Sequence, residues 1–195
     1  MDPFKTFHNV LSIYVSEKCL QELPVRWSEP HRFYHNVDHL IDILHTIEKN
    51  ISFKDLSVAE KHMLLLGAFF HDIVYDPTKT DNEDMSIKYF LHYYTSSNLS
   101  IRDNVVKLIE TTKHRKRPLN KLERIFWDAD NDGFKRGVEY SKLVEQKIRK
   151  EFKHVPKDKY KKARIDFLKS CTGLFGTNVD KDLIKMVEYV EKIYK

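Results

Sequence analysis

The stretch Met63-Leu-Leu-Leu-Gly-Ala-Phe-Phe70 is the longest apolar run in this 195-residue chain, and it decides the fold class. Its residues would be apolar on every side of a helix, a pattern that predicts a buried helix at the centre of a protein. The run is too short to cross a bilayer, because a membrane-spanning helix needs about 20 apolar residues. We therefore expect a central buried helix and no membrane-spanning segment.

Helical spacing continues on both sides of this run. Apolar residues recur at helical intervals at Val37, Leu40, Ile41, Leu44 and Ile47. Clusters that favour the first turn of a helix occur at Asp81–Asp84, Ser100–Asp103 and Asn120–Glu123. Further helices are expected over Val138–Phe152, Lys157–Ser170 and Val179–Tyr194, with a loop at Gly173–Asn178. No stretch alternates apolar and polar residues with period two, so the sequence predicts an all-α fold.

Composition narrows the class of protein. Hydrophobic residues at 41% and charged residues at 32% exclude a wholly disordered chain. The formal net charge of +5 favours anionic ligands. The basic clusters Lys113–Arg117 and Lys147–Lys162 carry few aromatic residues, so we expect solvated helix faces there and no nucleic-acid partner. Two cysteines make no disulfide framework and the N-terminus lacks the layout of a signal peptide, so we expect a cytoplasmic protein.

Residue types that bind metals gather in three places along the chain. His35 and His39 lie one helical turn apart and can share a face of a helix. The pair His71-Asp72 follows the most apolar helix, where polar groups are costly to bury unless something compensates them. Asp128 follows the apolar residues Ile125-Phe-Trp127. Each pattern is common by itself, and their joint occurrence beside three apolar helices indicates a metal site.

The ordered set His39, His71-Asp72 and Asp128 resembles the H…HD…D signature of HD-domain metal-dependent phosphohydrolases. One bacterial-type subgroup of uncharacterised predicted HD phosphohydrolases is similar over most of the chain, from about residue 24 to the C-terminus. The stretches that carry this resemblance are Glu29–His39, Phe69–Pro77, Asp81–Glu83, Thr111–His114 and Asp128–Asp130, with Tyr160, Arg164 and Phe167-Leu168 near the C-terminus.

The resemblance implies a fold, a cofactor and an activity. The fold is a single HD-type helical domain over residues 1–195, with the metal-site core at about 31–135 and C-terminal helices over 136–195. The cofactor is one divalent metal ion, or two: Mn²⁺, Fe²⁺, Co²⁺, Ni²⁺ or Zn²⁺, with Mg²⁺ at a more oxygen-rich site. The activity is hydrolysis of a small phosphate ester or anhydride, with a nucleotide as the expected substrate, by metal-activated water. The implied metal ligands are His39, His71, Asp72 and Asp128.

The resemblance also implies roles for residues around these ligands. Asp72 is expected to act in catalysis as well as in metal binding. Glu83 is expected either to serve as general acid/base or to supply negative charge at a helix N-terminus. His35 and His114 can hold a second metal, but we favour contacts with the ligands or the substrate, and His35 is also a catalytic candidate. The candidates for phosphate binding are Arg32, Lys113 and Arg115.

A competing motif overlaps Asp128. The segment Asp128–Glu139 fits the calcium-loop pattern D-x-D-x-D-G-x5-E in full. Lys135 and Arg136 occupy its eighth and ninth positions, and calcium loops commonly occur in pairs, both of which count against calcium. The family pattern is also interrupted at Asn131–Phe134, which an altered substrate pocket or lost activity would explain. The alternative function is therefore a non-catalytic helical binding protein or a pseudoenzyme, with Asp128–Glu139 as its calcium loop.

Overall fold

The structure is a computed structural model that describes residues 2–113 and 116–194. Within those residues it holds eleven α-helices, two short 3₁₀ helices and no strand, and an isolated bridge pairs Val15 with Tyr94. The predicted all-α fold is therefore confirmed. None of the helices in this part of the chain is both long and apolar enough to cross a membrane.

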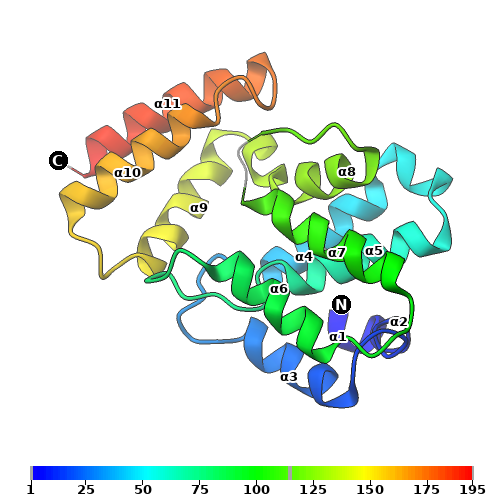
Figure 1. Cartoon of the computed structure of the whole chain (residues 1–195). Coiled ribbons are helices and arrows are strands. Elements are labelled where there is room, and N and C mark those ends of the chain that lie inside the picture. Colours follow the sequence, from blue (N-terminus) through cyan, green and yellow to red (C-terminus); the bar gives the residue numbers. More distant parts are fainter. Residues whose placement is uncertain (1, 114–115, 195) are drawn as a thin grey trace.

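The helices follow one another with short connections, as Figure 1 shows. In chain order they are α1 (Pro3–Thr6), α2 (His8–Leu11), α3 (Glu17–Trp27), α4 (Val37–Lys49), η1 (Ile51–Asp55), α5 (Val58–Phe70), α6 (Asn82–Tyr93), α7 (Leu99–Thr112), α8 (Lys121–Asp130), η2 (Asp132–Arg136), α9 (Val138–Glu151), α10 (Lys157–Ser170) and α11 (Thr177–Ile193).

The apolar run of the sequence forms the second half of α5, and every residue from Met63 to Phe70 is buried. α5 packs against α4, α6, α7 and α8, so it is the central helix that the sequence predicts. Gly67 allows a close approach, because a Cβ there would lie 3.1 Å from Leu108 Cδ1 on α7 and 3.2 Å from Phe126 Cε2 on α8. This packing fixes the last turn of α5, and His71 caps the end of that helix.

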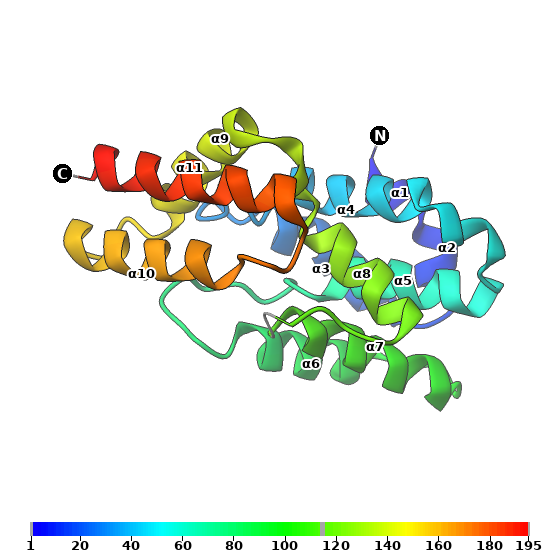
Figure 2. The ribbon, with the colours of Figure 1, turned by 90° about the horizontal axis from the view of Figure 1, so that it is seen from above.

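A second apolar cluster forms between α10 and α11, with Leu168, Cys171, Leu183, Met186 and Val190 as its buried members. The two helices run side by side and stand out from the body formed by α1–α8 (Figures 1 and 2). α9 joins this pair to the body. It contacts α11, and Glu151 at its last residue binds the backbone of residues 33–35.

The capping residues explain where the helices begin. Asn120 caps α8, because its side chain accepts hydrogen bonds from the N–H groups of Leu122 and Glu123, as predicted. The start predicted at Ser100 is wrong: Asn98 caps α7 by accepting from the Ile101 N–H, which places Ser100 inside the first turn. α9 and α10 lie where the sequence predicts them, and α11 begins at Thr177, two residues earlier than expected.

Candidate metal centre and its cavity

Three of the four residues implied as metal ligands meet at the inner end of a cavity. His39 lies on the first turns of α4, His71 caps the C-terminus of α5, and Asp72 follows it. Each residue offers one ligand atom, and these atoms lie within 4.8 Å of one another. His39 and His71 are buried, while Asp72 is partly exposed toward the cavity. His39 and the pair His71-Asp72 are far apart in the sequence, and the fold brings them into one compact group.

The His71 ring is oriented by the backbone. Its Nδ1 lies 3.0 Å from the Ala68 carbonyl oxygen, which can only accept, so Nδ1 carries the hydrogen. Its Nε2 is buried and meets the geometry of a hydrogen bond with no described residue, but it lies 3.2 Å from Asp72 Oδ2 and 3.6 Å from Asp130 Oδ1. A ring held by a hydrogen bond at one nitrogen, with the other nitrogen facing carboxylates, is typical of histidines that ligate metals. The donor set therefore fits a divalent cation once Nε2 has lost its proton.

The charges in this group depend on one another. Burial alone would lower the pKa of His71, but the neighbouring carboxylates of Asp72 and Asp130 raise it to about 9. Burial alone would raise the pKa of Asp72, but His71, His35 and His39 hold it well below its usual range. Asp72 therefore stays ionised. A cation that binds here must displace the proton that these carboxylates attract to His71.

Asp130 lies beside the His39–His71–Asp72 group, and Asp128 does not. Asp130 Oδ1 lies 3.3 Å from His39 Nε2 and 3.6 Å from His71 Nε2. The carboxylate of Asp128 binds Arg117 at 3.0 Å and Lys135 at 3.2 Å instead. Two residues along a helix differ by about 200° in direction, so α8 turns only one of these acids toward α4 and α5. The structure thus corrects the expectation that Asp128 lies with His39 and His71, and places Asp130 beside them.

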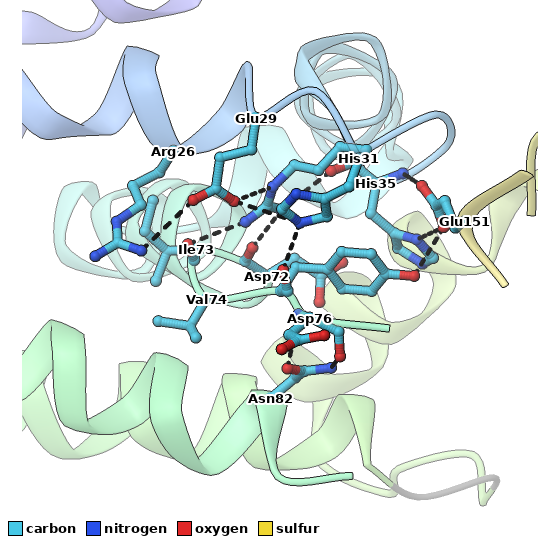
Figure 3. Close-up of polar contacts among 12 residues, drawn as sticks. Arg26, Glu29, His31, His35, Asp72, Ile73, Val74, Asp76, Asn82 and Glu151 are labelled. Atoms are coloured by element: carbon cyan, nitrogen blue, oxygen red, sulfur yellow. Dashed lines mark hydrogen bonds and ion pairs between the residues drawn. The ribbon is translucent and has the colours of Figure 1, made fainter. Parts of the chain in front are cut away.

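His35 is held by a buried carboxylate that the sequence analysis missed. Glu151 Oε1 accepts from the N–H groups of Phe33, Tyr34 and His35 at 2.8, 2.6 and 3.0 Å. Its Oε2 accepts from His35 Nδ1 at 2.8 Å and from the Tyr75 hydroxyl at 2.7 Å, as Figure 3 shows for the His35 ring. Burial works to raise the pKa of Glu151, yet the bonds from His35 and its neighbours lower it to about 2.

This arrangement orients His35 toward the metal centre. Burial alone would lower the pKa of His35, but the hydrogen bond to Glu151 and the charge of Asp72 raise it. The His35 ring centroid lies 5.8 Å from that of His39, and His35 lines the same cavity as His39 and His71. Because Nδ1 is occupied by Glu151, Nε2 is the nitrogen left to contact a ligand in the cavity. His35 is not a member of the His39–His71–Asp72 group. Its position suits contact with one of those metal ligands or with the substrate.

Glu151→Gln is expected to destabilise the fold by about 3 kcal/mol, because an amide cannot accept all five of these hydrogen bonds and lacks the charge that pairs with His35. Urea unfolding followed by circular dichroism measures the loss. Glu139→Gln on the same helix is the matched control, since that side chain is 85% exposed and pairs only with Lys142 among the described residues. Equal stability of the two variants would contradict the assignment.

Arg32 does not serve as a phosphate contact. Its guanidinium is fully buried and donates to the Glu29 carboxylate at 2.9 Å. It also donates to the carbonyl oxygens of His35, Asp72 and Ile73 at 3.0, 2.7 and 3.1 Å. The predicted phosphate-binding role is therefore wrong. Arg32 ties the loop before α4 to the turn after α5, and so holds His35 and Asp72 in place. Figure 3 shows this region together with the Asp76–Asn82 contact that anchors α6.

The remaining predicted residues divide into two groups. Glu83 and Lys113 line the cavity, and Lys113 also pairs with Asp84. Glu83 lies in the first turn of α6, so both roles expected for it remain open, as general acid/base or as helix N-terminal charge. His114 and Arg115 lie outside the described residues.

The oxygen groups of the calcium motif do not form one ligand shell. Asp130 faces His39 and His71, whereas Asp128 pairs with basic side chains. Asp132 binds Arg136, and Glu139 binds Lys142 on the surface. The segment is divided among the end of α8, the 3₁₀ helix η2 and the start of α9. These separate helical elements hold the acidic side chains apart, so this part of the chain does not have the geometry of a calcium loop.

Comparison of the chain with known proteins found no matching family model, no matching curated protein and no matching solved structure. The fold and the site together define an all-α protein with a His39–His71–Asp72 group that could hold a metal, at the end of a cavity of about 640 Å³.

Proposed function

We propose that this protein is a divalent-metal-dependent phosphohydrolase that acts on a small phosphate ester or anhydride. The observation that carries the proposal is the buried Nε2 of His71, which faces the carboxylates of Asp72 and Asp130, with ligand atoms of His39 and Asp72 within 4.8 Å. The H…HD…D order of these residues, which resembles HD-domain phosphohydrolases, supports the same activity. The resemblance makes a nucleotide the first substrate to test.

The proposed ligands are His39, His71 and Asp72, with Asp130 beside them. This mixture of imidazole and carboxylate suits Mn²⁺, Fe²⁺, Co²⁺, Ni²⁺ or Zn²⁺, and Mg²⁺ where water supplies further oxygens. When bound, such an ion supplies a Lewis acid that lowers the pKa of water and draws electron density from a phosphoryl oxygen.

The chain's own residues orient the substrate and carry protons. His35, fixed through Nδ1 by Glu151, can contact a phosphoryl oxygen through Nε2. Lys113 contributes a positive charge to the cavity wall, which suits an anionic substrate. Glu83 on the same wall is the candidate for taking a proton from attacking water or giving one to the leaving oxygen. The cytoplasm remains the proposed location, because the chain has only two cysteines.

The alternative is a pseudoenzyme or helical binding protein that keeps a metal without turnover. The observation that favours this alternative is the short 3₁₀ helix η2 after Asp130. It includes part of the Asn131–Phe134 interruption of the family pattern, which lost activity would explain.

Metal analysis and an activity panel separate the two functions. Protein purified without added metal is analysed for its elements, and is then assayed on phosphate monoesters, diesters and nucleotides with Mn²⁺, Co²⁺, Ni²⁺ or Mg²⁺. We expect a transition metal near one per chain and metal-dependent phosphate release. A loaded protein that hydrolyses none of these compounds would favour the pseudoenzyme.

A further inference from the structure

The cavity that begins at the metal centre has a second, apolar end. Its volume of about 640 Å³ lies within the range of about 300–1,000 Å³ typical of sites for small organic molecules. A phosphate group would fill only the part beside His35 and Asp72. The remainder is lined by side chains of α8, α9, α10, α11 and the loop before α11, among them Trp127, Val144, Ile148, Phe167, Phe175 and Met186.

Aromatic rings form a continuous apolar wall at this end. The Trp127 and Phe175 rings are stacked, with centroids 4.9 Å apart and planes 14° apart. Phe134 stacks on Phe175 at 5.2 Å. Since α8 carries both Trp127 and Asp130, the wall adjoins the metal centre, and a single ligand can touch both.

Four polar groups of this wall already have partners within the protein: the Tyr160 hydroxyl, Arg164 Nε, the Ser141 hydroxyl and one carboxylate oxygen of Asp182. The Tyr160 hydroxyl and Arg164 Nε donate to the buried carboxylate of Glu145, at 2.8 and 2.6 Å. The Ser141 hydroxyl donates to the Gly137 carbonyl at 3.1 Å, and Asp182 accepts from Lys185 at 3.2 Å. A sugar or other polyol placed here would exchange hydrogen bonds with water for contacts with apolar carbon, which is unfavourable.

We propose that the substrate is a phosphate ester of an apolar alcohol, whose hydrocarbon chain or ring occupies the apolar end while its phosphate lies beside His35 and Asp72. The proposal rests on the proposed function and narrows it. It disfavours nucleotides, because the ribose carries hydroxyl groups that this wall does not match.

Binding of n-alkylphosphonates, from ethyl to octyl, tests the proposal without requiring turnover. Calorimetry on the full chain, with Mn²⁺ and without it, measures the dissociation constant of each member of the series. Burial of a methylene is expected to tighten binding by about threefold to fourfold, until the chain fills the cavity. Val144→Trp is expected to remove this gain by filling the apolar end, and to leave ethylphosphonate binding within about twofold of the wild type.

Leu143→Trp is the matched control, because Leu143 neighbours Val144 on α9 but is 58% exposed. Val144→Thr, which keeps nearly the same shape but replaces a methyl group with a hydroxyl, gives a milder second test should the tryptophan variant not fold. Equal affinity across the series, with hydrolysis of short esters retained, would overturn this inference and leave the proposed function standing. A steep series without hydrolysis by any metal-loaded protein would overturn the proposed function and retain the apolar site.

Discussion

Asp72→Asn is expected to lower turnover of any phosphate substrate by about 10³-fold or more. The substitution keeps the shape of the side chain but removes the negative charge that lies 3.2 Å from His71 Nε2. A loss of about 4 kcal/mol of transition-state stabilisation, within the range that a catalytic metal supplies, corresponds to about this factor. Phosphate release at saturating metal and substrate measures the effect.

Asp38→Asn is the matched control for this variant. Asp38 lies next to His39 on α4, but its side chain is exposed and the Asn36 side chain caps the helix through the backbone N–H of residue 38. We expect wild-type turnover from Asp38→Asn and similar circular dichroism spectra from both variants. Full activity in Asp72→Asn would show that the assigned chemistry is wrong.

Asp130→Asn is expected to weaken divalent-metal binding by about 10- to 100-fold, whereas Asp128→Asn is expected to leave it unchanged. The two acids are separated by one residue, yet only Asp130 approaches His39 and His71. Calorimetric titration with Mn²⁺ or Zn²⁺ compares the variants directly, and the unfolding midpoint without metal reports any loss of fold.

The opposite ranking would return Asp128 to the ligand set and would contradict the register of α8. The pair is informative because Asp128 has its own partners, Arg117 and Lys135, on the other side of the helix. Equal losses in both variants would indicate that charge near the site, and not coordination, governs metal binding.

The sequence could predict the helices because their signals are local. Periodic apolar residues and the run at 63–70 depend only on near neighbours in the chain, and so does the cap at Asn120. His39, His71 and Asp72 come together as the motif order implies, because they end or begin apolar helices that must pack on one another.

Other features depend on partners far along the chain. Arg32 lies close to the motifs in the sequence, which suggested a phosphate contact, but it donates to carbonyl groups about 40 residues away. Glu151 lies within the segment Lys147–Lys162, which the sequence predicts to be a solvated helix face, yet it accepts hydrogen bonds from residues 33–35. One signal could have found it: Val144, Ile148 and Glu151 share a helix face at intervals of four and three.

The choice between Asp128 and Asp130 depends on the register of α8. In the fold Trp127 and Ala129 are buried on α8, while Asp128 is turned to basic side chains. The motif gives the order of acids in the chain, but the helix register decides which of them faces α4 and α5. The apolar end of the cavity could not be predicted, because α8, α9, α10 and α11 form it only after the C-terminal helices have packed.

Anomalous diffraction from crystals soaked in Mn²⁺ tests the central claim most directly. The account predicts one strong peak bonded to His39 Nε2, His71 Nε2 and a carboxylate oxygen of Asp72 at about 2.0–2.2 Å, with Asp130 as a further neighbour. A peak among Asp128, Asp132 and Glu139 instead, or saturating Mn²⁺ with no peak beside His71, would contradict it.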